Sequence, residues 1–272
     1  MISMDKYEAT GNDFILITHI PKDPSQLAKV VCDRHFGIGA DGLMYPSASK
    51  IADIKMNYYN ADGTIAPMCG NGIRAFAQFL ADKQILNKEV IHIETLAGMM
   101  ILTKIDDQFE VNLGKPQFDL SYPDVKETQS SCIAHTLNVE GVTIKNVYVL
   151  NLGTLHTVIF VDDVNQYDHI ANALCHHSFF PKYSNINFVK IIDKNNIQIK
   201  TYERGVGWTL SCGTGSSASQ YLSYKLSLTD YQAKVMVPGG ILRISVINEE
   251  VFLKGPAKFV GHIEMELSNE II

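Results

Sequence analysis

The chain has 272 residues, of which 46% are hydrophobic and 19% charged, and its net charge is −6. This composition is ordinary for a soluble globular protein, and an acidic chain without a basic stripe argues against nucleic acid or an anionic membrane as partner. No apolar run reaches the roughly 18 residues that a membrane span needs. The N-terminus, MISMDKYEATGNDF, lacks the apolar core of a signal peptide. Five cysteines without a CxxC pair indicate neither a disulfide framework nor structural zinc, so we expect a reduced, cytoplasmic protein.

Short runs rich in β-branched and aromatic residues recur along the chain, separated by turn residues, and predict strands. Four helices are expected among them: Ser25–His35 with Ser25 as N-cap, one after Cys69, one near Val164–His177 and one after Cys212. Many strands with few helices favour an α+β fold with largely antiparallel sheets. The predicted strands are 14–20, 53–59, 90–96, 99–105, 109–113, 146–152, 156–161, 188–192, 197–203, 234–240, 242–247, 250–255 and 262–267.

One phrase occurs twice, once in each half of the chain. Cys69-Gly-Asn-Gly precedes IRAFAQFL, and Cys212-Gly-Thr-Gly precedes SSASQYL. A thiol at a helix N-terminus faces backbone N–H groups and the positive end of the helix dipole, which favour the thiolate. Two such thiols in matching halves predict an acid/base pair acting on opposite faces of one substrate. The repeated plan of strands, Cys-Gly-x-Gly, helix and strands supports duplication, with a linker at Gly114–Val125.

The other three cysteines have no such context. A cysteine is most often a small buried hydrophobe, and we interpret Cys32, Cys132 and Cys175 in that way. Cys175-His176-His177 does not predict a metal site, because adjacent side chains on a helix point about 100° apart. Neither a P-loop nor a dinucleotide fingerprint is present, so no cofactor is expected.

Five phrases together resemble the diaminopimelate epimerase family and follow that family's order along the whole chain. They are ATGNDF (9–14), RHFGIGADGL (34–43), YNADGTIAPMCGNGIR (59–74), ERGVGWTLSCGTGSSA (203–218) and PGGIL (238–242). The resemblance implies two pseudo-twofold-related domains, each an antiparallel barrel-like sheet around a central helix. It places the N-terminal domain at 1–115, completed by 263–272, and the C-terminal domain at 116–262. Dimers are common in the family, and no interface can be identified from the sequence.

The resemblance also implies an activity: epimerisation of LL-diaminopimelate to meso-diaminopimelate, without a cofactor, by Cys69 and Cys212 as thiol and thiolate. The helix N-termini would hold the substrate's α-carboxylate, and Glu203 and Arg204 would bind an ammonium and the distal carboxylate. We interpret Arg34, His35 and Asp41 as structural and His156 as a supporting residue. The predicted substrate-binding residues are Asn12, Asn60, Gly70, Asn71, Thr154, Asn185, Glu203, Arg204, Gly213 and Thr214.

Two departures from the family pattern concern the substrate. The family usually has Gly-Asn-Pro-His where this chain has Gly153-Thr154-Leu155-His156, and Trp208 replaces a commonly acidic residue. The alternative function is therefore a racemase of another amino acid, such as histidine, on the same fold. A non-catalytic amino-acid-binding protein is a further alternative, disfavoured because both cysteines are present. Proline racemase-like relatives typically carry His where this chain has Asn71, which favours the diaminopimelate branch.

Overall fold

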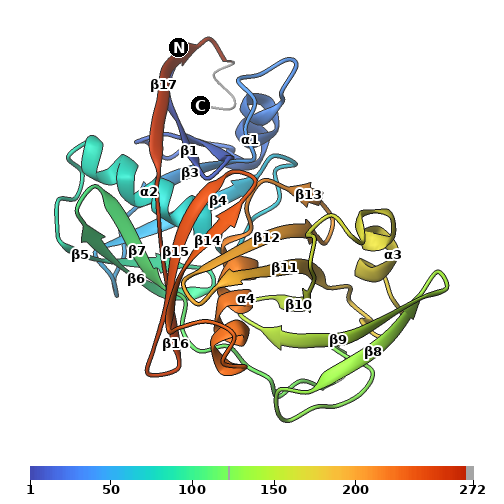
Figure 1. The fold of residues 1–272 in the computed structure, drawn as a ribbon. Helices are drawn as coiled ribbons and strands as arrows, with labels where there is room; N and C mark the ends of the chain where they lie inside the picture. The colour runs from blue at the N-terminus through green and yellow to red at the C-terminus, as the bar shows by residue number, and fades with distance from the viewer. Residues whose placement is uncertain (122, 268–272) are drawn as a thin grey trace. The chain divides into compact units, whose positions relative to one another are not determined.

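A computed structural model describes residues 1–121 and 123–267 of the chain. The chain forms two compact units, which we describe separately: unit 1 is Met1–Asn112 with the chain from Lys254, and unit 2 is Leu113–Leu253. Tyr122 of the predicted linker lies outside the described residues. Residues 268–272 of the segment predicted to complete the N-terminal domain lie outside them too. Figure 1 colours the chain from blue to red along its length.

Unit 1 is a sheet with two helices. Its strands pair in the order β17, β1, β2, β3, β4, β5, β6, β7, and the pairs β2–β3 and β4–β5 are parallel whereas the others are antiparallel. The elements are β1 (Ile2–Ala9), β2 (Asn12–Leu16), α1 (Pro24–Cys32), β3 (Gly42–Ser47), β4 (Ile54–Asn60), α2 (Gly70–Asp82), β5 (Val90–Thr95), β6 (Gly98–Ile105), β7 (Gln108–Asn112) and β17 (Lys258–Met265).

Unit 2 repeats that plan. Its strands pair in the order β8, β9, β10, β11, β12, β14, β15, and here β10–β11 and β12–β14 are the parallel pairs. Its elements are β8 (Ala134–Val139), β9 (Val142–Asn151), β10 (Leu155–Phe160), η1 (Asp168–Ile170), α3 (Ala171–Cys175), β11 (Asn185–Asp193), β12 (Asn196–Glu203), β13 (Gly207–Thr209), α4 (Gly213–Lys225), β14 (Gln232–Val237) and β15 (Gly240–Ile247). The next strand, β16 (Glu250–Gly255), crosses the unit boundary.

The helices occupy equivalent places in the two units. Parallel neighbours require a crossover connection, and α2 lies in the β4–β5 crossover as α4 lies in the β12–β14 crossover. In the same way α1 connects β2 to β3, and η1 with α3 connects β10 to β11. The predicted α+β class is confirmed, with one refinement: each described sheet contains two parallel pairs among its antiparallel ones. The repeated order of strands and helices is what duplication of one unit would give.

The two central helices bury different side chains. In α2 the residues Ile73, Phe76 and Leu80 are fully buried at helical spacing, and the helix packs on β1, β2 and β7. In α4 the first turns bury the small residues from Gly215 to Ser219, the later turns bury Tyr221 and Leu222, and the helix packs on β10, β11 and β15. Figure 1 shows α2 in turquoise and α4 in orange. Because small side chains allow a helix backbone to approach a sheet closely, the N-terminus of α4 lies directly over buried strand residues.

Several sequence predictions need correction. Helix α1 begins one residue earlier than predicted and its N-cap is Asp23, whose Oδ1 accepts from Gln26 N at 2.9 Å, rather than Ser25. The predicted helix near 164–177 is reduced to η1 and α3, because Asp163 bonds the backbone and side chain of Asn165 in a turn that competes with helix.

Four strands of the structure, β1, β3, β8 and β13, were not predicted. In β1 the charged Asp5 interrupts the apolar pattern, yet it is buried and paired with Lys83 at 2.7 Å. Strand β3 contains Pro46, and a proline argues against a strand when a sequence is read alone, because it has no backbone N–H to donate to a neighbouring strand. None of the helices in the described ranges is long and apolar enough to cross a membrane.

Candidate active site

Cys69 is the N-cap of α2. Its backbone is extended, with φ −138° and ψ 125°, and its Sγ accepts from the backbone N–H of Gly72 at 3.4 Å. The same sulfur lies 3.6 Å from Oδ1 of Asn12, to which the thiol donates. A β-carbon at Gly72 would lie 2.3 Å from the Met44 methyl and 3.3 Å from Cβ of Cys69, so an added side chain would displace the Met44 methyl.

A buried arginine fixes the first turn of α2. Arg74 is fully buried, and its guanidinium donates to Gly70 O at 2.8 Å, to Asn71 Oδ1 at 3.1 Å and to Thr10 Oγ1 at 3.3 Å. Burial lowers the pKa of Arg74 to about 10, and a negative charge at Cys69 or Glu8 would act in the opposite direction. The guanidinium therefore holds the oxygen of the Asn71 amide. The amide nitrogen of Asn71 then faces Asn12, with 3.5 Å between Asn71 Nδ2 and Asn12 Oδ1.

Cys212 takes the equivalent place in unit 2. It is the N-cap of α4, with φ −115° and ψ 107°, it is buried, and its Sγ lies 3.7 Å from the hydroxyl of Thr214. Both predicted thiols therefore immediately precede the first residue of the helix that forms their unit's core.

Asn187 of β11 underlies the N-terminus of α4. Its Oδ1 accepts from Thr201 Oγ1 at 3.0 Å and its Nδ2 donates to Thr157 O at 3.0 Å. A β-carbon at Gly215 would lie 2.3 Å from that Oδ1 and 3.2 Å from Sγ of Cys212. Asn187 was not predicted from the sequence, because an asparagine inside a strand carries no motif of its own. The glycine at position 215 was the one sequence signal that another group packs against the start of α4.

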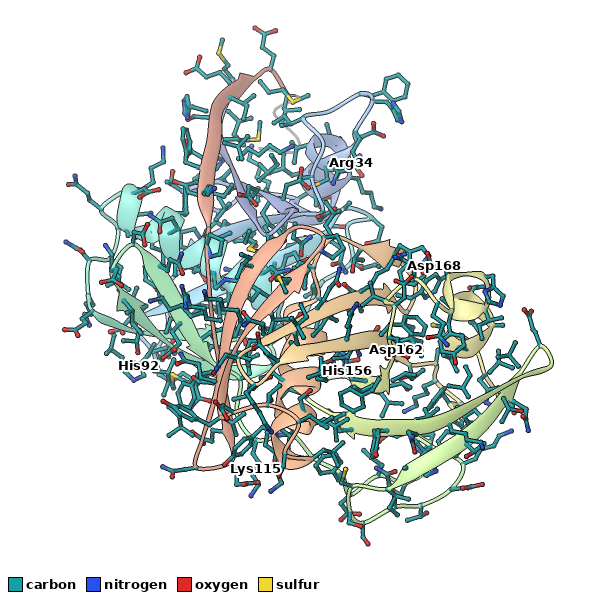
Figure 2. The ribbon with its side chains drawn as sticks, viewed as in Figure 1. Arg34, His92, Lys115, His156, Asp162 and Asp168 are labelled. Carbon is teal, nitrogen blue, oxygen red and sulfur yellow. The ribbon has the colours of Figure 1, made fainter. Side chains whose placement is uncertain are left out.

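His156 is fully buried on β10, where Figure 2 labels it. Its Nδ1 accepts from Asn187 Nδ2 at 3.4 Å. Burial, assisted by the positive charge of Arg204, lowers the pKa of His156 to about 3. The imidazole is therefore neutral at physiological pH, and its Nε2 has no hydrogen-bond partner among the described residues.

Glu203, Arg204 and Asn185 lie together at the ends of β12 and β11. The backbone N–H of Arg204 donates to Asn185 Oδ1 at 2.9 Å, and its exposed guanidinium donates to Lys182 O at 2.9 Å. Glu203 accepts from Thr209 Oγ1 at 2.8 Å. This arrangement places an exposed cation and a carboxylate on adjacent residues.

Trp208 lies on the other face of this sheet from Glu203. It is the cross-strand neighbour of Tyr202, and the two rings meet edge to face at 5.3 Å. The ammonium of Lys200 stands 4.2 Å from the Trp208 ring. Because Tyr202 and Glu203 are consecutive in a strand, their side chains point to opposite faces. The ring of the tryptophan that departs from the family pattern therefore packs on Tyr202 and Lys200, on the face of the sheet opposite to Glu203.

Two further predicted residues, Asn60 and Thr154, lie at turns that follow strands. Asn60 ends β4 and its Nδ2 donates to Thr64 Oγ1 at 3.0 Å in a turn. Thr154 lies in the tight turn between β9 and β10, where its carbonyl accepts from Leu152 N at 3.0 Å. The structure thus brings Asn12, Cys69 and Asn71 into one cluster and Asn185, Glu203 and Arg204 into another.

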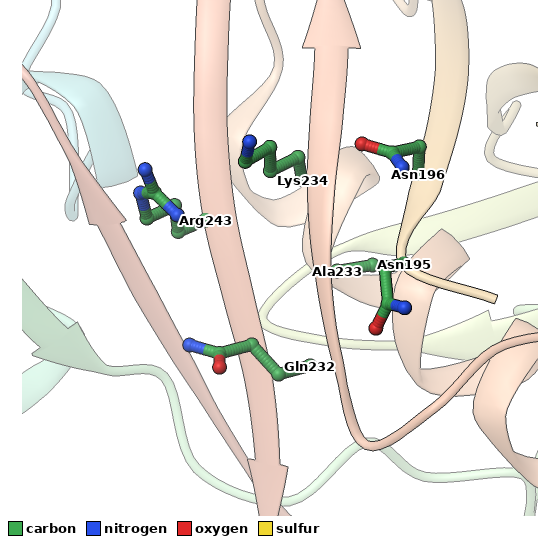
Figure 3. A pocket seen from close by; sticks show the side chains of 6 residues that line it. All are labelled: Asn195, Asn196, Gln232, Ala233, Lys234 and Arg243. Carbon is green, nitrogen blue, oxygen red and sulfur yellow. The ribbon is translucent and has the colours of Figure 1, made fainter. Parts of the chain in front are cut away.

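A separate hollow of about 210 Å³ opens at the β14–β15 hairpin (Figure 3). Lys234 and Arg243 are cross-strand neighbours there, beside Asn195 and Asn196. It contains none of the predicted site residues. Within the described residues no three His, Cys, Asp or Glu side chains are grouped to hold a metal ion.

The fold is shared with several solved structures whose sequences differ widely from this one. A putative phenazine biosynthesis protein from Clostridium difficile superposes with a TM-score of 0.73 at 12% identity, covering 98% of this chain and 100% of that one. A probable proline racemase from Agrobacterium radiobacter superposes with a TM-score of 0.70 at 13% identity, covering 98% and 94%. The arrangement of strands and helices in this chain is therefore that of these solved structures.

Sequence comparison is more specific. The family model for diaminopimelate epimerase matches residues 4–119 and 148–260. A diaminopimelate epimerase from Alkaliphilus metalliredigens is 39% identical over 94% of this chain and 95% of the relative, and one from Caldanaerobacter subterraneus subsp. tengcongensis is 37% identical over 96% and 98%. The chain belongs to the diaminopimelate epimerase family.

Proposed function

We propose that this protein interconverts LL- and meso-diaminopimelate by cofactor-independent proton transfer through Cys69 and Cys212. The observation that carries the proposal is the matched position of the two thiols, each the extended N-cap of its unit's core helix. The reaction would supply the meso isomer for lysine and peptidoglycan precursors. Family membership and the names of the relatives support this substrate.

Inversion at Cα breaks one C–H bond and forms another on the opposite face. One thiolate removes the α-proton and becomes a thiol, the electron pair is delocalised onto the α-carboxylate, and the other thiol donates its proton to Cα and becomes a thiolate. The thiols exchange states in each turnover and return to their starting states when the reverse reaction occurs. Backbone N–H groups in the first turns of α2 and α4, at Gly70, Asn71, Gly213 and Thr214, stabilise the developing negative charge.

Binding of the rest of the substrate falls to polar side chains. The Arg204 guanidinium binds the distal carboxylate and Glu203 an ammonium, while Asn12, Asn60, Asn185 and Thr154 provide further polar contacts. The protein would act in the cytoplasm, consistent with five free cysteines, and as a homodimer by analogy with its family. Sedimentation of the purified protein tests the dimer.

The decisive experiment is incubation with a panel of amino acids in D₂O, followed by chiral separation and mass measurement. Diaminopimelate should gain one deuterium at Cα as its LL and meso forms interconvert. If diaminopimelate gains none while histidine or another amino acid does, the assignment of substrate is wrong and the thiol-pair reaction remains. If no amino acid exchanges, the protein is a binding protein rather than an enzyme.

Racemisation of another amino acid, such as histidine, is the second candidate. Thr154 favours it, since a threonine lacks the amide that the family usually places there. Trp208 does not, because its ring packs on Tyr202 and Lys200, on the face of the sheet opposite to Glu203. The panel in D₂O separates the two candidates directly.

A further inference from the structure

The amide of Asn12 has a defined orientation. Its Nδ2 donates to Oδ2 of Asp41, and a carboxylate only accepts, so the nitrogen must face Asp41. The oxygen then faces the opposite way, toward Cys69 Sγ at 3.6 Å and Asn71 Nδ2 at 3.5 Å. Both of these neighbours donate. The network of partners therefore fixes which end of the Asn12 amide faces the thiol.

Asp41 is itself held firmly. Arg34, labelled in Figure 2, donates to its Oδ1 at 2.8 Å, and the backbone N–H of Asp13 donates to its Oδ2 at 3.1 Å. The backbone of Asp41 donates to Asp13 O at 2.8 Å. Arg34 also forms a fork with the Asp13 carboxylate, at 2.7 and 3.1 Å. The carboxylate that orients Asn12 is thus anchored by side-chain and backbone contacts.

The protonation state of Cys69 follows from this arrangement. A neutral thiol satisfies both of the contacts described above, because it accepts from Gly72 N and donates to Asn12 Oδ1. A thiolate keeps the first contact and loses the second, and it then faces the negative end of the amide dipole. Other charges of unit 1 lie nearby: Arg74 on α2 favours the thiolate, while Lys6 and Arg34 are paired with Asp13.

We propose that Asp41 is a positioning residue which, by fixing the Asn12 amide, keeps Cys69 protonated in the substrate-free protein. Cys69 is then the resting acid and Cys212 the resting base. In unit 2 the thiol of Cys212 meets the hydroxyl of Thr214, which can donate to a thiolate. The assignment of acid and base rests on the proposed function, whereas the protonation of Cys69 does not require turnover.

The test is alkylation of the substrate-free protein with iodoacetamide across a pH series, with each cysteine followed by peptide mass. In Asp41→Asn the Asn12 amide is released and can turn its nitrogen to the sulfur. The alkylation midpoint of Cys69 should fall by about one pH unit, while that of Cys212 stays the same. Asp62→Asn is the matched control, because the Asp62 carboxylate binds Thr64 in the same unit and does not contact Asn12.

Variants at Asn12 distinguish an effect of the amide's orientation from a direct effect of the Asp41 charge on Cys69. In Asn12→Ala the amide is absent, so the Cys69 midpoint should fall, and adding Asp41→Asn should change it no further. If the Asp41→Asn shift persists at full size in that background, the carboxylate acts by its charge alone and the proposal is overturned. An unchanged midpoint in Asn12→Ala overturns it too, and that variant decides the matter if Asp41→Asn fails to fold.

The two proposals fail in different ways. Turnover of diaminopimelate by the wild-type protein is measured in parallel with alkylation. A Cys69 shift without any epimerisation contradicts the proposed function and leaves the role of Asp41 standing. Epimerisation without a Cys69 shift supports the proposed function and contradicts the role of Asp41. Where both hold, the acid and base limbs of the kcat/KM profile against pH should move in Asp41→Asn and stay in place in Asp62→Asn.

Discussion

Gly215 lies directly against Asn187: a β-carbon at position 215 would stand 2.3 Å from Oδ1 of the asparagine. That oxygen accepts from Thr201 and the amide nitrogen donates to Thr157 O, so Asn187 is bonded on both sides and buried. It has no free direction in which to move. The second glycine of the CGTG phrase is therefore required by packing at the base of α4, three residues after the thiol.

Gly215→Ala should destabilise the protein by about 1–3 kcal/mol, the usual cost of overpacking a core, and should reduce activity by displacing Cys212. Chemical denaturation measures the first effect and epimerisation the second. Gly261→Ala is the control, because a β-carbon there meets nothing within 4 Å. Gly72→Ala should cost less, since its nearest neighbour is the movable methyl of Met44. Equal stability of the Gly215 and Gly261 variants would contradict this account.

Cys69→Ala and Cys212→Ala should each abolish epimerisation while the fold is retained, because one thiol cannot serve both faces of Cα. Turnover and circular dichroism check the two parts of the prediction. Cys132→Ala should behave as wild type, since that cysteine lies outside both helix N-termini. Either single variant should still eliminate a good leaving group from a modified substrate, a step that needs a base alone. Substantial epimerisation by either variant rules out the two-base reaction.

Arg204→Met should weaken substrate binding by about 2 kcal/mol, the scale of a charge-assisted pair left unmatched. Calorimetric titration with diaminopimelate measures this loss. Arg243→Met is a matched control, because Arg243 is an exposed cation of the same unit on β15. An unchanged affinity in Arg204→Met would remove Arg204 from the substrate-binding residues.

His156→Gln should flatten the dependence of stability on pH. The folded pKa of His156, about 3, lies below the ordinary value of 6.5, so protons bind the unfolded chain more readily. The contribution of this pKa difference to the free energy of unfolding is complete above about pH 6.5. It is lost as the pH falls toward the folded pKa, by about 1.4 kcal/mol per pH unit. Denaturation at pH 7, 6 and 5 measures the slope, and the exposed His176→Gln is the control. A variant as steep as wild type would refute the assignment.

Trp208→Glu should leave the ratio of activities on diaminopimelate and histidine unchanged, because the ring faces away from Glu203. It should cost about 1 kcal/mol of stability through the lost contacts with Tyr202 and Lys200. Thr154→Asn, which restores the amide common in the family, should instead raise affinity for diaminopimelate. A changed substrate ratio in Trp208→Glu would show that the ring does influence the site.

Much of the site could be predicted because its residues lie in short, contiguous phrases. A cysteine before Gly-x-Gly and an apolar helical pattern define a helix N-terminus locally, so Cys69 and Cys212 needed no tertiary information. The α+β class followed equally from alternating short strands. The N-cap of α1 was mispredicted because the carboxylate of Asp23, two residues before Ser25, accepts from Gln26 N. The third helix was predicted too long because Asp163 accepts from Asn165 N in a local turn.

The sequence by itself determined the two thiols, their helices and the repeated plan, since each depends on neighbours within a few residues. Only the tertiary structure decided what surrounds them. Asp41 is 29 residues from Asn12 along the chain, yet the two side chains are hydrogen-bonded. Asn187 is 28 residues before Gly215, yet it lies so close that a β-carbon at Gly215 would collide with it. Hydrogen-bond partners and close approaches of this kind arise when strands distant in sequence pair in a sheet, and no local pattern encodes which residues then meet.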